Sequence, residues 1–141
     1  MSFGWIVVLT LVTLIVGGTI VTNIRVRRMA RRRAGEGFSD FAASFVNRNV
    51  PHEVLLNTYN YFGEWNRVAG ELFPVRATDN ISNVYGCVEE DLDDAVGEIL
   101  EKSGRRWPTH DEVPQPPAGE TIEDVVLYVA AAPVAPVGNG V

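Results

Sequence analysis

Cysteine is almost missing from this sequence, which contains Cys87 and no other. A single cysteine excludes an intrachain disulfide and a zinc site built on cysteines, and it is compatible with a reducing compartment. The two histidines, His52 and His110, lie far apart in the chain, and neither has the spacing of metal ligands. We therefore expect no metal site and no bound cofactor.

Motifs of catalysis are also lacking. The sequence has no glycine-rich phosphate loop, no nucleophile elbow and no pair of residues suited to acid–base catalysis. Its 141 residues provide one membrane segment and one domain of about a hundred residues, so a second catalytic domain would not fit. We predict that the protein is not an enzyme.

Basic residues are scarce beyond residue 33. From residue 36 to residue 141 the chain has six basic and eighteen acidic residues, a net charge of −12, whereas the whole chain carries −6. A surface of this charge repels nucleic acid, so we expect no nucleic-acid partner. The other six basic residues form one short run: Arg25, Arg27, Arg28, Arg31, Arg32 and Arg33.

Charge is absent from residues 5–24, WIVVLTLVTLIVGGTIVTNI. As a helix this segment spans about 30 Å, the thickness of the hydrocarbon layer of a bilayer. A cleaved signal peptide is the alternative, but its positive charge would precede the apolar stretch, and here the charge follows it. We predict an uncleaved transmembrane helix.

The arginine run predicts the orientation of that helix, because basic residues that flank a span are retained on the cytoplasmic side. The expected protein is single-pass in the cell (inner) membrane, with residues 1–4 outside and the C-terminal domain in the cytoplasm. The same arginines would contact anionic membrane lipid, at about 1 kcal/mol each. A pure topology signal is the alternative role.

The segments after the basic linker, residues 25–37, predict a small all-α domain over residues 38–131. Ser39 is expected to cap a short helix that buries Phe41, Phe45 and Val46, and Pro51 to open a second helix. The second helix has apolar residues at helical spacing: Val54, Leu55, Tyr59, Phe62 and Trp65.

The rest of the domain is predicted as a loop and two more helices. Residues 73–86 are expected to be irregular and to bury Val75, Ile81, Val84 and Tyr85. A third helix follows and stops at Gly104, and Thr121 with Asp124 forms a capping box for the last one. Residues 132–141 are expected to be a disordered tail.

Five carboxylates crowd the start of the third predicted helix: Glu89, Glu90, Asp91, Asp93 and Asp94. They favour the positive end of the helix dipole, and a solvated helix start is the simplest interpretation. They lack the spacing of an EF-hand, so a metal site is not predicted. We expect them to bind a protein partner that has a basic surface.

Residues 73–131 contain, in this order, a long loop, the acidic helix around Asp91-Leu92, Gly104 with Pro108 four residues on, and a helix that begins Thr121-Ile122. This order of features resembles the acyl carrier protein family. The resemblance implies a small, acidic four-helix bundle. It does not extend to the serine that carries the phosphopantetheine arm in that family, because Glu89 or Asp91 occupies its position. A carboxylate cannot hold this arm in a stable phosphodiester.

The sequence therefore predicts a membrane-anchored, non-enzymatic interaction domain with a carrier-like fold, whose acidic helix docks a basic partner. One alternative is a true acyl or aminoacyl carrier that is modified at Ser82 or Cys87. A reactive Cys87 is not expected, because the neighbouring carboxylates raise the pKa of its thiol. The other alternative is a small structural subunit of a membrane complex.

Overall fold

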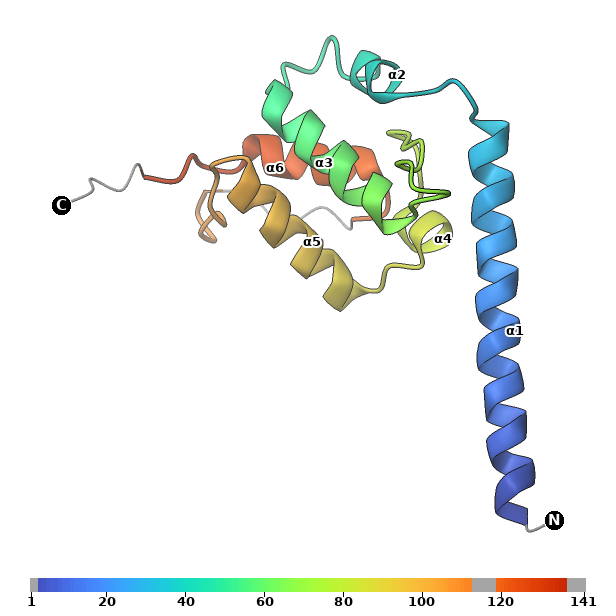
Figure 1. The fold of residues 1–141 in the computed structure, drawn as a ribbon. Coiled ribbons are helices and arrows are strands. Elements are labelled where there is room, and N and C mark those ends of the chain that lie inside the picture. The colour runs from blue at the N-terminus through green and yellow to red at the C-terminus, as the bar shows by residue number, and fades with distance from the viewer. Residues whose placement is uncertain (1–2, 113–118, 137–141) are drawn as a thin grey trace. The chain divides into compact units, whose positions relative to one another are not determined.

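The computed structural model describes residues 3–112 and 119–136 (Figure 1). Within these residues the chain forms six α-helices and no β-strand, so the predicted all-α class is confirmed. Contacts between residues divide the chain into two units, Met1–Ala34 and Gly35–Val141.

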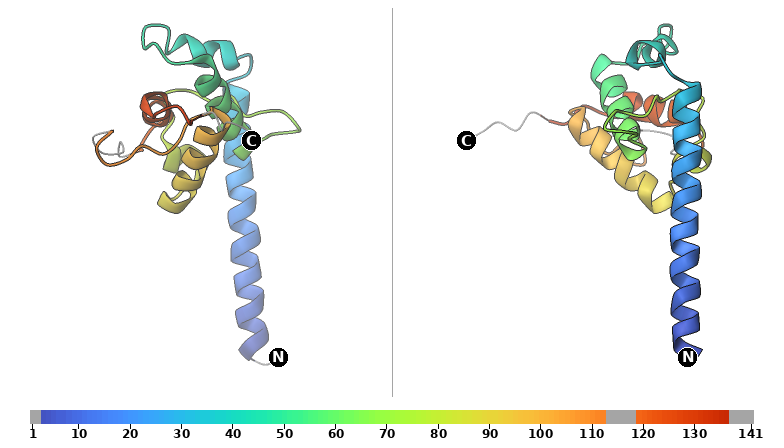
Figure 2. Two further views of the ribbon diagram at one scale, coloured as in Figure 1. Left: turned by 90° about the vertical axis from the view of Figure 1, so that its left-hand side faces the viewer. Right: turned by 45° about the vertical axis from the view of Figure 1, so that its right-hand side comes forward.

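The first unit is the helix α1 (Phe3–Arg32), which is continuous in all views (Figure 2). It is long and apolar enough to cross a membrane, by length and composition. Threonine hydroxyls donate to the carbonyl four residues earlier, as Thr10 does to Ile6 at 2.8 Å and Thr22 to Gly18 at 3.0 Å. The hydroxyl groups are thereby satisfied inside the helix, as an apolar solvent requires.

Helix α1 continues past residue 24, although the sequence analysis placed a linker from residue 25 onward. Arginine favours helices, and the first glycine after the apolar stretch is Gly35, whose φ of +90° ends the regular conformation. Most of the arginine run is therefore helical and continues the apolar segment.

The second unit contains the remaining helices: α2 (Phe38–Ala43), α3 (His52–Trp65), α4 (Ile81–Tyr85), α5 (Glu89–Lys102) and α6 (Ile122–Ala131). Helix α3 packs against α2, α5 and α6, and α5 also packs against α6 (Figure 1).

The core of the second unit lies between α3, α5 and α6. Val54 and Phe62 of α3, Ile99 of α5 and Val126 of α6 are fully buried. Each such side chain stabilises the fold by about 1.5–3 kcal/mol relative to an exposed one. The predicted stripe of α3 is confirmed except at Trp65, which is 40% exposed.

Helix α2 differs from its prediction at both ends. The helix begins after Gly37 rather than Ser39, because the Asp40 carboxylate accepts a hydrogen bond from the Gly37 backbone N–H at 2.9 Å. Phe41 and Phe45 are buried as predicted, but Val46 is 77% exposed. The helix ends at Ala43, so helical spacing no longer predicts where the residues after it lie.

Residues 73–86 were predicted to be irregular, but they contain the one-turn helix α4. The Asn80 side chain caps this helix by accepting the Asn83 backbone N–H at 2.9 Å, and Gly86 ends it with a φ of +66°. Five residues are too few for a helical stripe to be visible in the sequence. Val75, Ile81 and Tyr85 are buried as predicted, whereas Val84 is only half-buried.

Helices α5 and α6 have the ends that the sequence predicts. Gly104, with a φ of +65°, follows α5, and the next N–H, that of Arg105, donates to Leu100 O at 2.8 Å. At the start of α6 the Thr121 N–H donates to the Asp124 carboxylate at 2.9 Å, and the Asp124 N–H donates to Thr121 Oγ1 at 3.3 Å. The predicted capping box is therefore present.

The described part of the predicted tail, residues 132–136, packs on the domain. Ala132 is 2% exposed. The Arg106 N–H donates to Pro133 O at 3.0 Å, and the Ala135 N–H donates to Gly104 O at 2.9 Å. The prediction of disorder for residues 137–141 concerns residues outside those that the structure describes.

Candidate functional site

The acidic start of α5 is the first part of the candidate site, and its carboxylates do not all have the same role. Glu89, Glu90 and Asp91 form the first turn of the helix. The Asp91 carboxylate accepts a hydrogen bond from the Val88 N–H at 3.0 Å, and the residue is half-buried. Asp91 therefore caps its own helix and is less available to a partner than the sequence indicated.

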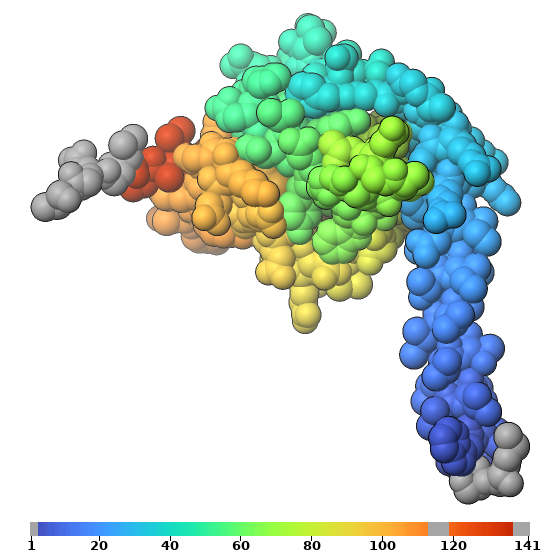
Figure 3. Space-filling view, in the orientation of Figure 1, coloured from blue at the N-terminus to red at the C-terminus, as the bar shows by residue number. Residues whose placement is uncertain are grey.

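The other four carboxylates lie on two different sides of α5. Residues four apart share one side of a helix, so Glu89 pairs with Asp93, and Glu90 pairs with Asp94. All four are exposed. Glu89 and Asp93 line a cleft, whereas Glu90 and Asp94 are not among the described residues that line it. The start of α5 lies at the surface of the domain (Figure 3, yellow).

The cleft is the second part of the site, and it has a volume of about 770 Å³. Its apolar floor consists of four residues from α4, α5 and α6: Ile81, Leu92, Val96 and Val125. Ile81, Val96 and Val125 are buried, and Leu92 is half-buried. The volume lies within the range of clefts that hold drug-sized ligands.

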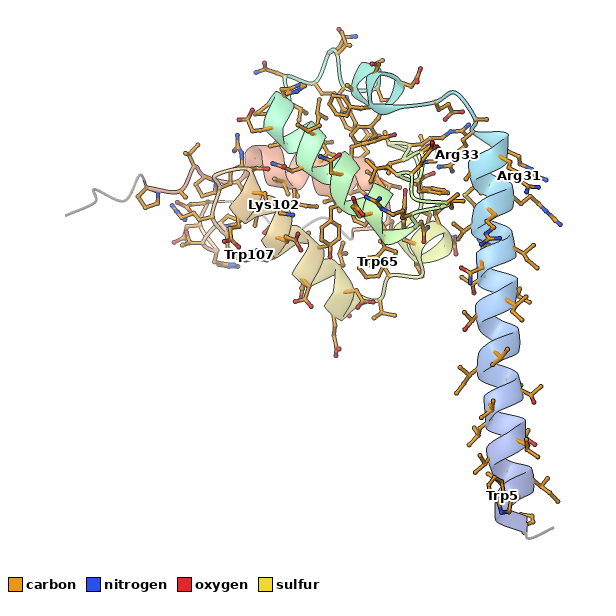
Figure 4. All side chains as sticks on the ribbon, in the orientation of Figure 1. Trp5, Arg31, Arg33, Trp65, Lys102 and Trp107 are labelled. Carbon is orange, nitrogen blue, oxygen red and sulfur yellow. The ribbon has the colours of Figure 1, made fainter. Side chains whose placement is uncertain are left out.

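Trp107 and Tyr128 add an aromatic wall to the cleft. Their ring centroids are 6.4 Å apart. Trp107 lies beside α5 at Gly97, where an added Cβ would be 3.5 Å from Trp107 Cζ2 (Figure 4). The ring remains 48% exposed. No sequence pattern predicts this role, because Trp107 follows a helix end and belongs to no periodic pattern.

Three carboxylates border the cleft: Glu89 and Asp93 of α5, and Glu120 from the segment before α6. Burial and, to a smaller extent, the charge of Asp93 raise the pKa of Tyr128. Among the described residues that line the cleft, none is basic. The site therefore combines an apolar floor with negative charge at its edge.

Cys87 and Ser82, the two alternative attachment points, both line the cleft but differ in exposure. Cys87 is 5% exposed, and burial together with the charge of Asp91 raises the pKa of its thiol to about 11. The thiol is protonated at neutral pH and is shielded from reagents. Ser82 of α4 is exposed.

The histidines take part in neither the cleft nor a metal cluster within the described chain. The His52 ring packs edge-on against Phe38, with centroids 5.4 Å apart, and His110 is exposed. Next to His110, Glu112 accepts two hydrogen bonds from Arg106, at 2.7 and 2.9 Å. In residues 3–112 and 119–136 no three metal-binding side chains lie close enough together to hold an ion.

The arginine run belongs to α1 and the residue after it, with Arg31 and Arg32 in the last turn. Basic residues at the C-terminal end of a helix interact favourably with its dipole. Arg31 and Arg32 therefore stabilise this end of α1, in addition to the membrane-surface role predicted for the run.

The structure describes the residues at or near the position that the resemblance aligns with the attachment serine of acyl carrier proteins. Glu89 and Asp91, which the resemblance aligns with the attachment serine, lie in the first turn of α5. Ser103 directly follows the other end of α5 and accepts a hydrogen bond from Asn57 Nδ2 at 3.1 Å. Comparison with protein-family models, with curated proteins and with solved structures gives no significant match.

Proposed function

We propose that the protein is a membrane-anchored, non-enzymatic interaction domain that docks a basic protein partner through α5. One observation carries the proposal: exposed carboxylates of α5 border a cleft of about 770 Å³ in which no described lining residue is basic. The surrounding chain, residues 36–141, has a net charge of −12. Such a surface attracts a basic partner and accelerates its association.

The proposed scaffold is a four-helix, acyl-carrier-like bundle. Three features support it: a long segment with one short helix between α3 and α5, the acidic start of α5 with Gly104 after its end, and the Thr-Ile start of α6. The proposed function uses the scaffold without the carrier reaction, because no serine stands at the start of α5.

A carrier role on Cys87 is disfavoured by the burial of the thiol and by its raised pKa. Ser82 is exposed at the cleft, so attachment of a phosphopantetheine arm to Ser82 can be tested directly. Intact mass is measured after incubation with a phosphopantetheinyl transferase and coenzyme A. The proposal expects no added mass, and stoichiometric addition of the phosphopantetheine arm would overturn it.

The proposed location is the cell (inner) membrane, with α1 as the anchor and the domain in the cytoplasm. The length and composition of α1 and the position of the arginine run after its apolar part support this arrangement. The arginines would bind anionic lipid at the same surface. An anchored domain would meet partners that are themselves at or in the membrane.

The test is co-purification of partners with the full chain in mild detergent at about 50 and 500 mM salt, two ionic strengths at which the screening length of charges differs about threefold. The wild type is compared with the double variant Asp93→Asn/Asp94→Asn. Glu71→Gln/Asp111→Asn is the control, because it also removes two exposed carboxylates but lies outside α5. A basic partner should be lost at high salt and from the α5 variant, and retained by the control. Retention under all conditions would reject the proposal.

A further inference from the structure

The cleft beside α5 has two properties that a purely electrostatic docking surface does not need. It has a floor of apolar side chains, with Leu92 half-buried, and Val88 at its edge is 60% exposed. It also has an aromatic wall, in which Trp107 is 48% exposed. Apolar surface of a partner that covered these groups would remove them from water, which favours binding.

We propose that this cleft holds an amphipathic helical segment of the protein partner, with an apolar side chain on the floor and a lysine or arginine at the edge. This inference rests on the proposed function and deepens it, because it names the part of α5 that makes contact and the chemistry of the segment. A helix that lays its apolar face into a groove is a recurrent mode of peptide recognition.

The negative charge at the edge requires a basic residue in the bound segment. Glu89 and Asp93 are one turn apart on α5, and Glu120 comes from another element, so the carboxylates approach the cleft from two elements. A lysine or arginine can lay its aliphatic stem on the floor and keep its charged end near these groups. Trp107 and Tyr128 also line the cleft, and aromatic rings attract a cation that lies over their faces.

Other occupants fit the same groups less well. An anionic lipid or a fatty acid would place its charge beside three carboxylates and be repelled. A neutral apolar ligand would fill the floor, but it would partly desolvate the carboxylates without pairing them, which costs free energy. The charge complementarity therefore selects a cationic segment.

The decisive comparison uses two double variants that remove the same charge from two different sides of α5. Glu89→Gln/Asp93→Asn neutralises the side that lines the cleft, and Glu90→Gln/Asp94→Asn neutralises the other side. Both leave the Asp91 cap in place. The probe is a fluorescent 18-residue amphipathic peptide of leucine and lysine. It is titrated against the full chain in phosphatidylcholine nanodiscs, with empty nanodiscs as the blank.

The cleft variant should bind the peptide at least tenfold more weakly than the wild type, and the other variant within about threefold of it. Equal weakening by both variants would overturn the cleft assignment and leave the proposed function standing. No weakening by either variant would overturn both.

The apolar half of the proposal has its own test. A peptide with serine in place of leucine keeps the charge, and it should bind at least tenfold more weakly. Val88→Ser removes an exposed apolar group at the edge of the cleft and provides a favoured N-cap residue, so it should weaken binding without harming α5. A serine–lysine peptide that binds as tightly as the leucine–lysine peptide would contradict the proposal, and so would equal binding of an uncharged leucine–serine peptide.

Discussion

The carboxylate of Asp91 accepts a hydrogen bond from the backbone N–H of Val88, at a distance of 3.0 Å. This bond closes the N-terminal end of α5 and satisfies a donor that the helix itself leaves free. One of the five acidic residues that were predicted to bind a partner therefore also stabilises the helix that presents the others.

The capping role of Asp91 predicts a loss of stability that the other α5 acids do not share. Asp91→Ala should lower the free energy of unfolding by about 1 kcal/mol, because the Val88 N–H loses its acceptor. Asp94→Ala, at an exposed position six residues after the N-cap Val88, should change it by less than about 0.5 kcal/mol. Chemical denaturation of the full chain in detergent, followed by circular dichroism, measures both. Equal losses would show that the cap does not contribute.

Two helical glycines predict opposite effects of the same substitution. At Gly97 an added Cβ would lie 3.5 Å from Trp107, which is an ordinary contact. Gly97→Ala should therefore stabilise α5 by about 0.5–1 kcal/mol, because alanine lowers the backbone entropy of the unfolded chain. At Gly63 the Cβ would lie 3.2 Å from Leu72 Cβ and 3.3 Å from Phe73 O. Gly63→Ala should therefore destabilise the domain, by about 1–3 kcal/mol.

Thermal unfolding of the two glycine variants beside the wild type measures the difference. The midpoint should rise for Gly97→Ala and fall for Gly63→Ala. A fall of similar size for both would contradict the packing described between Gly97 and Trp107.

The burial of Cys87 predicts slow reaction with thiol reagents. Because the pKa of the thiol is raised to about 11, the thiolate is rare at pH 8, and the residue is 5% exposed. A water-soluble disulfide reagent should modify the folded protein at least tenfold more slowly than the protein unfolded in guanidinium chloride. Equal rates would show an accessible thiol and would revive the thioester alternative.

The same pKa predicts how stability depends on pH. The thiol ionises at a lower pH in the unfolded chain, near its ordinary value of 9.0, than in the folded protein, near 11. The stabilisation is therefore present below pH 9 and is lost as the pH rises from about 9 to 11. Cys87→Ala should lack this component, so the stability difference between variant and wild type should shrink over that interval. A constant difference would contradict the shift.

Much of the helical organisation could be predicted because it depends on local signals. The apolar stripe of α3, the glycine after α5 and the capping box of α6 are each encoded within one or two helical turns. Helix α4 escaped prediction because five residues show no period. Val46 was misplaced because the helix that would have turned it inward ends at Ala43.

The candidate site could be predicted only in part. The acids of α5 were visible as a cluster, but their division between cleft, cap and outer side depends on which side of the helix packs on α3 and α6. Trp107 and Glu120 join the cleft from segments far along the chain, and no local pattern marks such a meeting. The sequence therefore predicts the negative charge of the site but not the cleft that the carboxylates border.

We propose that one helix holds an acidic domain at the cytoplasmic face of a membrane, and the most direct test is to determine on which side of the membrane the domain lies. The full chain with a C-terminal epitope is expressed in bacterial cells, and its membranes are washed with alkaline carbonate and prepared as sealed vesicles of both orientations. We expect the protein to stay in the carbonate-washed membrane and protease to remove the epitope from inside-out vesicles alone. Release of the protein by carbonate, or loss of the epitope from sealed right-side-out vesicles, would contradict it.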